Sequence, residues 1–331
     1  AASPMLVRTY SSTRNVPAMA ELYEKHLNIA WHALSLWWFN KIDGRGPNDV
    51  LTNLEEHLAA LRVMARHNKP FEPNIPHHFS FRGGDDHSYV LSSYLAAITA
   101  KRLGVKQLVL QTMLNTPKYT WGIQDLAKAR ALLQLVRELE DKDFTVYHQP
   151  RAGLDYFSPD LDKAKVQLAV VTCMMDDVEP ADDKGPDMIH VVSYSEAVHL
   201  ATPPVINESI QITLHALEAY RKAKKIGRMD DMLHHAEVEE RTKELYTNVK
   251  QTVRTLGKHI PDLYSPQGLY EVLRRGVFAV PYLWEGQEEF KAAIAWKTGL
   301  VNGGVHVVDQ QGKIIPPAER MDMLFEQNER S

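Results

Sequence analysis

The sequence predicts an α/β fold built on a parallel sheet, and two observations lead to this prediction. Short apolar segments with the length of buried strands alternate with longer segments in which apolar residues recur at helical spacing. Parallel strands need a crossover between them, so this alternation is typical of βαβ units. The 331 residues, 44% of them hydrophobic, can bury a large core as one large α/β domain or two smaller ones.

The expected elements follow one another along the chain. The opening Ala1-Ala2-Ser3-Pro4 runs at once into apolar residues, which is expected of a segment that enters the middle of a fold. The apolar run from Ala30 to Phe39 is too short to span a bilayer and is expected as a buried strand or a helix end. Pro70, Pro73 and Pro76 predict an extended loop, because proline fixes φ and lacks an N–H donor. Helices are expected over 48–64, 88–103, 123–140, 160–175 and 204–225, and strands over 107–111, 144–147 and 188–192.

The composition changes at about Arg228, which suggests a division into 1–227 and 228–331. The second part is expected to hold a charged helix over 229–255, a loop over 257–266 and a short helix over 269–275. Apolar residues on both sides of Gly312 predict a hairpin over 304–315. We therefore interpret 228–331 as a helical and hairpin extension.

Charge and cysteine content exclude several classes of function. The net charge of -4 comes with intermixed acidic and basic residues, so a nucleic acid or an acidic membrane surface is not expected as a partner. Cys173 is the one cysteine, which excludes an internal disulfide and a cysteine zinc site and favours a reducing cytoplasm. Phosphate-binding GxGxxG and P-loop motifs and the GxSxG motif of serine hydrolases are absent. A ligand is therefore expected in a pocket.

Polar residues follow each expected strand, where parallel folds gather their functional groups. They are Thr112 and Asn115 after the first strand, His148, Gln149, Arg151 and Gly153 after the second, and Tyr194 and Glu196 after the third. Arg151 offers a planar fork for a carboxylate and Gln149 adds hydrogen-bonding atoms, although Arg151 could instead pair with Asp155. Tyr194 and Glu196 suit an ammonium, a ribose or a proton in transit, and the alternative is a helix N-cap with its Glu.

Two further segments admit both a functional and a structural interpretation. The loop from Arg82 and Gly83 to His87 precedes a helix, where free N–H groups could meet an anion, but a plain turn with an Asp cap explains it equally well. His235 and Glu239 share one helical face as metal ligands do, yet no cysteine or third ligand is near, so a solvated face is preferred and no metal is expected. Trp37 and Trp38 are expected in the core.

Several segments, in order and spacing, resemble the barrel-forming large chain of coenzyme-B12-dependent glutamate mutase, also called methylaspartate mutase. They are Ser92 to Ala100, Leu103-Gly104-Val105, Ile123 to Ala127, Val146 to Gln149 with Gly153, and Val191 through Glu196 to Pro203. The likeness is clearest over 89–217 and faint beyond Arg228. Periodicity alone leaves a closed barrel and an open doubly wound sheet equally possible. The resemblance implies a partial (β/α)8 TIM-type barrel over 1–227, without its N-terminal strands.

The resemblance also implies a cytoplasmic isomerase that rearranges the carbon skeleton of a small carboxylic or amino acid by a radical mechanism. Its cofactor is adenosylcobalamin, carried mainly by a separate small cobalamin-binding chain. That chain carries Asp-x-His-x-x-Gly, and the nearest approach here, Asp85 to Val90, lacks the glycine. The expected partners are therefore the cobalamin-binding subunit, a further chain that completes the barrel, and the acid substrate.

Individual residues carry over from the family only in part. Arg8 falls at one of three carboxylate-binding arginines, and Glu196 at a glutamate of the adenosine-contacting set. The family's lysine is Val192 here, its tyrosine pair falls near Leu36 and Asn40, and a further glutamate is Ala30, which indicates a substrate other than glutamate or a loss of catalysis. A B12-independent lyase or aldolase and a non-catalytic assembly subunit therefore stay open. The expected roles are catalytic for Glu196, Tyr194 and His148, substrate-binding for Arg8, Arg151, Gln149 and Arg82, and cofactor-binding for Gly83, Thr112, Asn115 and Gly153.

Overall fold

A five-stranded parallel sheet forms the centre of the computed structural model, which describes residues 5–10, 12–179, 185–230 and 232–325. The opening Ala1–Pro4 lies outside the described residues. The strands are β1 (Val7–Tyr10), β2 (Ile29–Leu34), β3 (Phe71–Pro73), β4 (Gln107–Leu114) and β5 (Thr145–Ala152). Their order in the sheet is their order in the chain, and every neighbouring pair is parallel. The predicted α/β class is confirmed.

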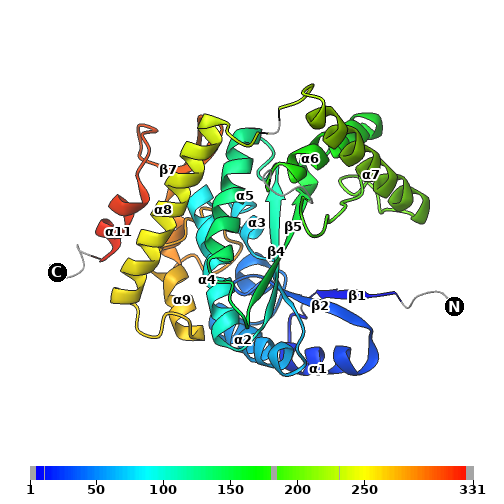
Figure 1. Cartoon of the computed structure of the whole chain (residues 1–331). Helices are drawn as coiled ribbons and strands as arrows, with labels where there is room; N and C mark the ends of the chain where they lie inside the picture. The colour runs from blue at the N-terminus through cyan, green and yellow to red at the C-terminus, as the bar shows by residue number, and fades with distance from the viewer. Residues whose placement is uncertain (1–4, 11, 180–184, 231, 326–331) are drawn as a thin grey trace.

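Long helices connect the strands, and α4 and α5 lie along one side of β4 and β5 (Figure 1). The helices of this part are α1 (Val16–His26), α2 (Val50–Arg66), α3 (Pro76–Ser80), α4 (Asp86–Arg102), α5 (Gly122–Arg137), α6 (Leu161–Asp176) and α7 (Pro203–Lys225). The side chains of Asp49, Asp85 and Asp160 accept hydrogen bonds from backbone N–H groups at the starts of α2, α4 and α6. All five long helices predicted in this part are confirmed to within a few residues.

The predicted loop around Pro70, Pro73 and Pro76 is wrong, because this stretch contains a central strand and a helix. Phe71 pairs with His32 of β2 and with Leu108 of β4, so β3 joins the two halves of the sheet. Pro73 is the last residue of β3, where a missing N–H is tolerated, and Pro76 occupies the first position of α3. The prolines therefore mark the boundaries of two short elements.

The predicted strand over 188–192 is reduced to one bridge. Met188 N donates to the carbonyl of His148 at 3.1 Å and His190 N donates to that of Pro150 at 3.1 Å, which gives a parallel bridge between Arg151 and His190. The segment then turns away. It extends the sheet beside β5 by a few residues only.

The C-terminal part packs against the helices around the sheet. It holds α8 (Ala236–His259), α9 (Pro266–Arg274), α10 (Lys291–Ile294), β6 (Lys297–Val301), β7 (Gly304–Val308) and α11 (Pro317–Phe325), and α8 runs beside α5 (Figure 1). The predicted hairpin around Gly312 is confirmed, because Ile315 N donates to the carbonyl of Val307 and Asp309 N to that of Lys313, both at 2.9 Å. The β6–β7 hairpin, which turns at Asn302 and Gly303, both with positive φ, was not predicted. Val308 also bridges Ile314.

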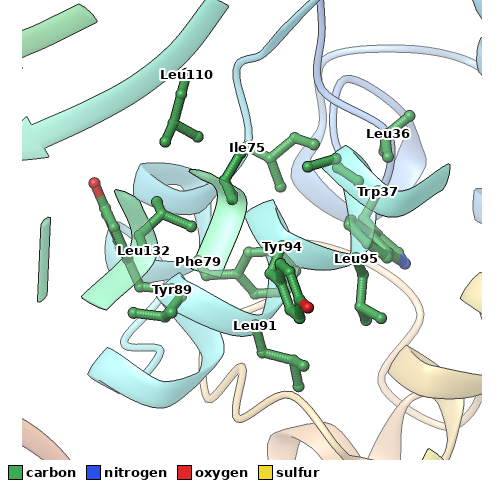
Figure 2. Close-up of a cluster of buried hydrophobic side chains, with 14 of the residues drawn as sticks. Leu36, Trp37, Ile75, Phe79, Tyr89, Leu91, Tyr94, Leu95, Leu110 and Leu132 are labelled. Carbon is green, nitrogen blue, oxygen red and sulfur yellow. The ribbon is translucent and has the colours of Figure 1, made fainter. Parts of the chain in front are cut away.

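The hydrophobic core lies between the sheet and these helices. Trp37 and Trp38 are fully buried, as expected, and Trp37 meets Phe278 edge-on with 5.2 Å between ring centroids. Figure 2 shows Trp37, Phe79 and Leu95 in one cluster. Trp37 Nε1 donates to the carbonyl of Leu269 at 2.9 Å, so the core extends into the C-terminal part.

A buried group of charges fastens the C-terminal part to α4. The carboxylate of Asp86 lies 3.4 Å from Lys128 Nζ and 3.3 Å from Arg241 Nη2, and it accepts from Val305 N at 3.1 Å. Asp85 lies 3.2 Å from Arg320. These contacts join α4, α5, α8, β7 and α11.

Within the described ranges, no helix has both the length and the apolar character needed to cross a bilayer.

Candidate functional site

One face of the sheet carries a row of polar side chains, which we call the polar face. Pairing registers Arg8 with Trp31, Ala33 with Glu72, Gln111 with Gln149 and Met113 with Arg151. Because side chains alternate along a strand, these paired residues point to the same side. Contacts between their side chains, described next, confirm this direction. The core-forming residues of β4 and β5 point the other way.

Glu72 is the centre of the polar face. Its buried carboxylate receives both Nε and Nη2 of Arg8 at 2.6 and 2.5 Å, and Trp31 Nε1 at 2.7 Å. Asn74 Nδ2 and Gln111 Nε2 donate to it at 2.8 and 2.7 Å. Burial raises the pKa of Glu72, but the hydrogen bonds and charge of Arg8 outweigh it, so the pKa lies below its usual value. Glu72 is therefore a fixed anion that neutralises Arg8, and its lone pairs are already used.

Arg151 differs from Arg8 because no acidic partner neutralises it. Its Nε donates to the carbonyl of Ala152 at 3.2 Å, and among the described residues no carboxylate lies within 4.0 Å of its guanidinium. The pairing with Asp155 considered from the sequence is not formed. Burial, and next the charge of Arg8, lower the pKa of Arg151, as expected for a desolvated cation beside another cation. An incoming anion would relieve both effects.

The histidines around this site are neutral at physiological pH. Burial, and then the positive charge of Arg151, lower the pKa of His190 to about 3. Burial also holds the pKa values of His77 and His78 well below the usual value. The Arg8–Glu72 pair cancels, so the charge of Arg151 dominates this end of the polar face, and the arrangement suits an anion.

The structure divides the residues predicted around β5. Gln149 lies on the polar face and its Oε1 is buried without a hydrogen-bond partner among the described atoms. His148 points to the opposite side, where its Nε2 lies 2.9 Å from Thr112 Oγ1 and its Nδ1 lies 3.1 Å from Glu179. The geometry thus places the expected catalytic His148 and cofactor-binding Thr112 away from the polar face.

Tyr194 and Glu196 lie beyond the bridge at His190. The Tyr194 hydroxyl donates to Glu208, which raises the pKa of Tyr194, and Glu208 also pairs with Lys165 at 2.8 Å. Glu196 is exposed and its charge acts on Arg151. Neither residue begins a helix, so the N-cap interpretation is wrong.

Arg82 and Gly83 lie after β3, the central strand, in the loop between α3 and α4. Arg82 donates to Asp43 at 3.2 Å and to the carbonyl of His78 at 3.0 Å. Asp85 accepts from Ser88 N at 3.1 Å, so the loop has the Asp cap considered from the sequence. Burial lowers the pKa of Arg82 to about 10.

The residues expected to hold a cofactor do not form one site. Asn115 and Gly153 lie together at the carboxyl ends of β4 and β5, where a Cβ on Gly153 would lie 3.1 Å from the Asn115 carbonyl. Thr112 is buried behind the sheet, and the ring of Tyr282 packs on Gly83. His87, the nearest approach to the cobalamin-ligand motif, is buried and lies 3.1 Å from Thr252 Oγ1. The described part of the chain therefore does not fit cobalamin by itself.

Other sequence positions have structural explanations. Val192 and Leu36 are buried, and Asn40 begins the short helix η1 (Lys41–Asp43) by accepting from Ile42 N. Ala30 lies on β2 one residue before Trp31 and so points away from the polar face. The exposed His234 and Glu239 lie 3.3 Å apart, and the described residues contain no group of three or more potential metal ligands.

Sequence reasoning missed Glu72, Trp31 and Gln111. The missing signal was the strand Phe71-Glu72-Pro73, hidden between prolines, because a glutamate inside a buried strand indicates a paired charge.

Comparison with known proteins gives no family for this chain: no protein-family model matches it, and no curated protein matches it either.

Proposed function

We propose that the polar face binds a small carboxylic acid, with its carboxylate on Arg151. The observation that carries this proposal is that Arg151 has no acidic partner among the described residues, whereas Arg8, whose charge acts on Arg151, is neutralised by Glu72. A guanidinium presents parallel N–H donors that match a carboxylate, and partial burial strengthens the pairing. The free amide oxygen of Gln149 is available for a second polar group of the acid.

The remaining residues orient the acid and keep the site rigid. Glu72 fixes Arg8, Trp31, Asn74 and Gln111 in one network, so the floor of the site is organised before a ligand arrives. Because its pKa is lowered, Glu72 stays ionised. Its role is therefore to provide negative charge and not to transfer a proton. The neutral histidines add hydrogen-bonding groups without adding charge.

In this proposal the chain is the acid-binding subunit of an adenosylcobalamin-dependent carbon-skeleton mutase, and its sheet is part of a (β/α)8 barrel. Support comes from the resemblance to the glutamate mutase barrel chain and from five parallel strands whose order follows the chain. The polar face would then line the barrel interior. Because the described residues do not fit cobalamin, the cofactor, which supplies the radical chemistry, would be brought by a small partner chain. The cytoplasm is the proposed compartment.

Acid binding can be tested by titration calorimetry with propionate, succinate and glutamate. Replacing Arg151 by Met removes a charge-assisted bond, so affinity should fall by about ten- to a hundredfold. Arg151→Lys should recover only part of it, because an ammonium lacks the planar fork. Arg66→Met is the matched control, since Arg66 is an exposed arginine paired with Glu21. Unchanged binding by Arg151→Met would refute the assignment.

The mutase itself needs a separate experiment. The protein purified from its own cells is analysed by native mass spectrometry and by visible absorbance for a corrinoid. Co-purification of a small chain and a corrinoid would support the mutase. An acid-binding protein that stays alone and colourless with added adenosylcobalamin and a cobalamin-binding chain would instead favour a B12-independent lyase at the same acid site.

A further inference from the structure

A cavity of about 430 Å³ lies at the carboxyl ends of β2 and β3, and Arg151 is not among the residues that line it. The chain after β2 supplies Asp43 and Arg45, and the chain after β3 supplies His78 and Arg82. The C-terminal segment 281–284 covers one side with two aromatic residues. Small-molecule sites have volumes of about 300–1,000 Å³, so this cavity has the size of a ligand site. We call it the arginine–aromatic pocket.

Tyr282 and Trp284 form the aromatic side of the pocket. They are 71% and 75% exposed, although backbone hydrogen bonds hold both residues: Tyr282 N donates to the Arg82 carbonyl at 3.2 Å and Trp284 N to that of Ile42 at 2.8 Å. Glycines lie beneath both rings. A Cβ on Gly83 would lie 2.8 Å from the Tyr282 ring, and one on Gly44 would lie 3.3 Å from that of Trp284. Each ring is thus supported on one side and open on the other, as a stacking surface requires.

Two arginines share one carboxylate on the other side. The side chain of Asp43 is fully buried and accepts from Arg45 Nε and Nη2 at 2.9 and 2.5 Å and from Arg82 Nη2 at 3.2 Å. Two cations on one anion leave a net positive charge. Within the described structure, Nη1 of Arg45 and Nε of Arg82 have no hydrogen-bond partner and can donate to a ligand.

Aromatic side chains hold both guanidinium groups in place. Arg45 lies over the Phe39 ring, 3.7 Å from its centroid, and Arg82 lies over Trp38 at 4.4 Å. A guanidinium that is already ordered loses little entropy when it binds an anion. The pocket therefore combines fixed cations with open aromatic rings.

We propose that the arginine–aromatic pocket binds a nucleoside phosphate, with the base against Trp284 and Tyr282 and the phosphate at Arg45 and Arg82. Arginine is suited to phosphate, and aromatic side chains stack on any base. The site uses neither Arg151 nor Glu72, so it goes beyond the proposed acid-binding function and does not depend on it.

The test is titration calorimetry of the full chain with adenosine 5′-monophosphate, adenosine and inorganic phosphate as separate probes. The nucleotide should bind more tightly than either part. Trp284→Ala should weaken it by about tenfold, because one stacked base contributes about that much. Arg45→Met should weaken the nucleotide and leave the weak binding of adenosine unchanged. The matched control is Trp121→Ala, which removes a 54% exposed tryptophan that also packs on a glycine, Gly303.

Each outcome decides the proposal. Nucleotide binding that Trp284→Ala and Arg45→Met weaken, and that Trp121→Ala and Arg151→Met leave intact, supports the site. Absence of nucleotide binding at millimolar concentration overturns it. The proposal is also overturned if adenosine or phosphate binds as tightly as the nucleotide, because one half of the pocket would then contribute nothing to the affinity. If Trp284→Ala loses nucleotide binding but keeps acid binding, the two sites are independent. A failure of the nucleotide proposal would then leave the acid-binding proposal unaffected.

Discussion

Replacing Glu72 by Gln should destabilise the protein strongly, because one carboxylate satisfies donors from the three strands β1, β2 and β4 and from Asn74, directly after β3. Glutamine offers one acceptor oxygen, and its NH2 group faces donors in either orientation, because each oxygen of Glu72 accepts from at least two side chains. Arg8 then loses its counter-charge. Breaking a buried pair costs about 3–5 kcal/mol, and since the Arg8 side chain is 23% exposed, we expect the lower end, about 3 kcal/mol.

Urea unfolding followed by tryptophan fluorescence and far-ultraviolet circular dichroism measures this cost, and coincident transitions validate the free energies. Glu21→Gln is the matched control, because Glu21 also accepts from two side chains, Arg66 and His67, but at the surface. It should cost only a small fraction of the Glu72 value. A loss below about 1 kcal/mol for Glu72→Gln would refute the idea that Glu72 organises the polar face.

Three further predictions concern stability. Lys128→Met should cost about 3–5 kcal/mol in urea unfolding, because Asp86 and Asp125 lose their shared buried cation. Lys250→Met is the control and should cost little, because Lys250 is partly exposed and its partner Glu138 is exposed. Gly153→Ala should lower the melting temperature, since its Cβ would lie 2.1 Å from Thr116 Oγ1 in the buried strand end; an unchanged value would contradict the packing. The free energy of unfolding should fall as the pH drops from 7 to 5. A histidine with a lowered pKa stays neutral in the folded protein but is protonated below about pH 6.5 in the unfolded chain. Each such histidine lowers the free energy of unfolding by up to about 1.4 kcal/mol per pH unit. A flat pH profile would contradict this for the buried histidines His57, His77, His78 and His87 and for the partly buried His190.

Periodicity predicted the long helices because apolar residues recur at helical spacing along each of them. For α2, the apolar spacing and the Asp49 cap define both the face and the start. The strand β3 escaped prediction because three residues carry no alternation and its prolines indicate a loop. Its strand conformation depends on pairing with β2 and β4, which lie far away in sequence.

The site could be predicted only where one residue carries the chemistry. Arg151 and Gln149 follow a recognisable strand, and the structure places both on the polar face. The opposite direction of His148 follows from alternation once β5 is known to run to Ala152, but the expected strand ended at Tyr147. The Glu72 network depends on the register of four strands, which no local pattern contains.

The carboxylate of Asp86 has a consequence for how the molecule unfolds. It is bound at once by α5, α8 and the hairpin strand β7, which come from widely separated parts of the sequence. Opening any one of them leaves a buried charge without part of its compensation, so each opening raises the cost of keeping the others closed. Amide protons of α4, α5 and α8 should therefore exchange as one cooperative unit, with similar free energies of opening.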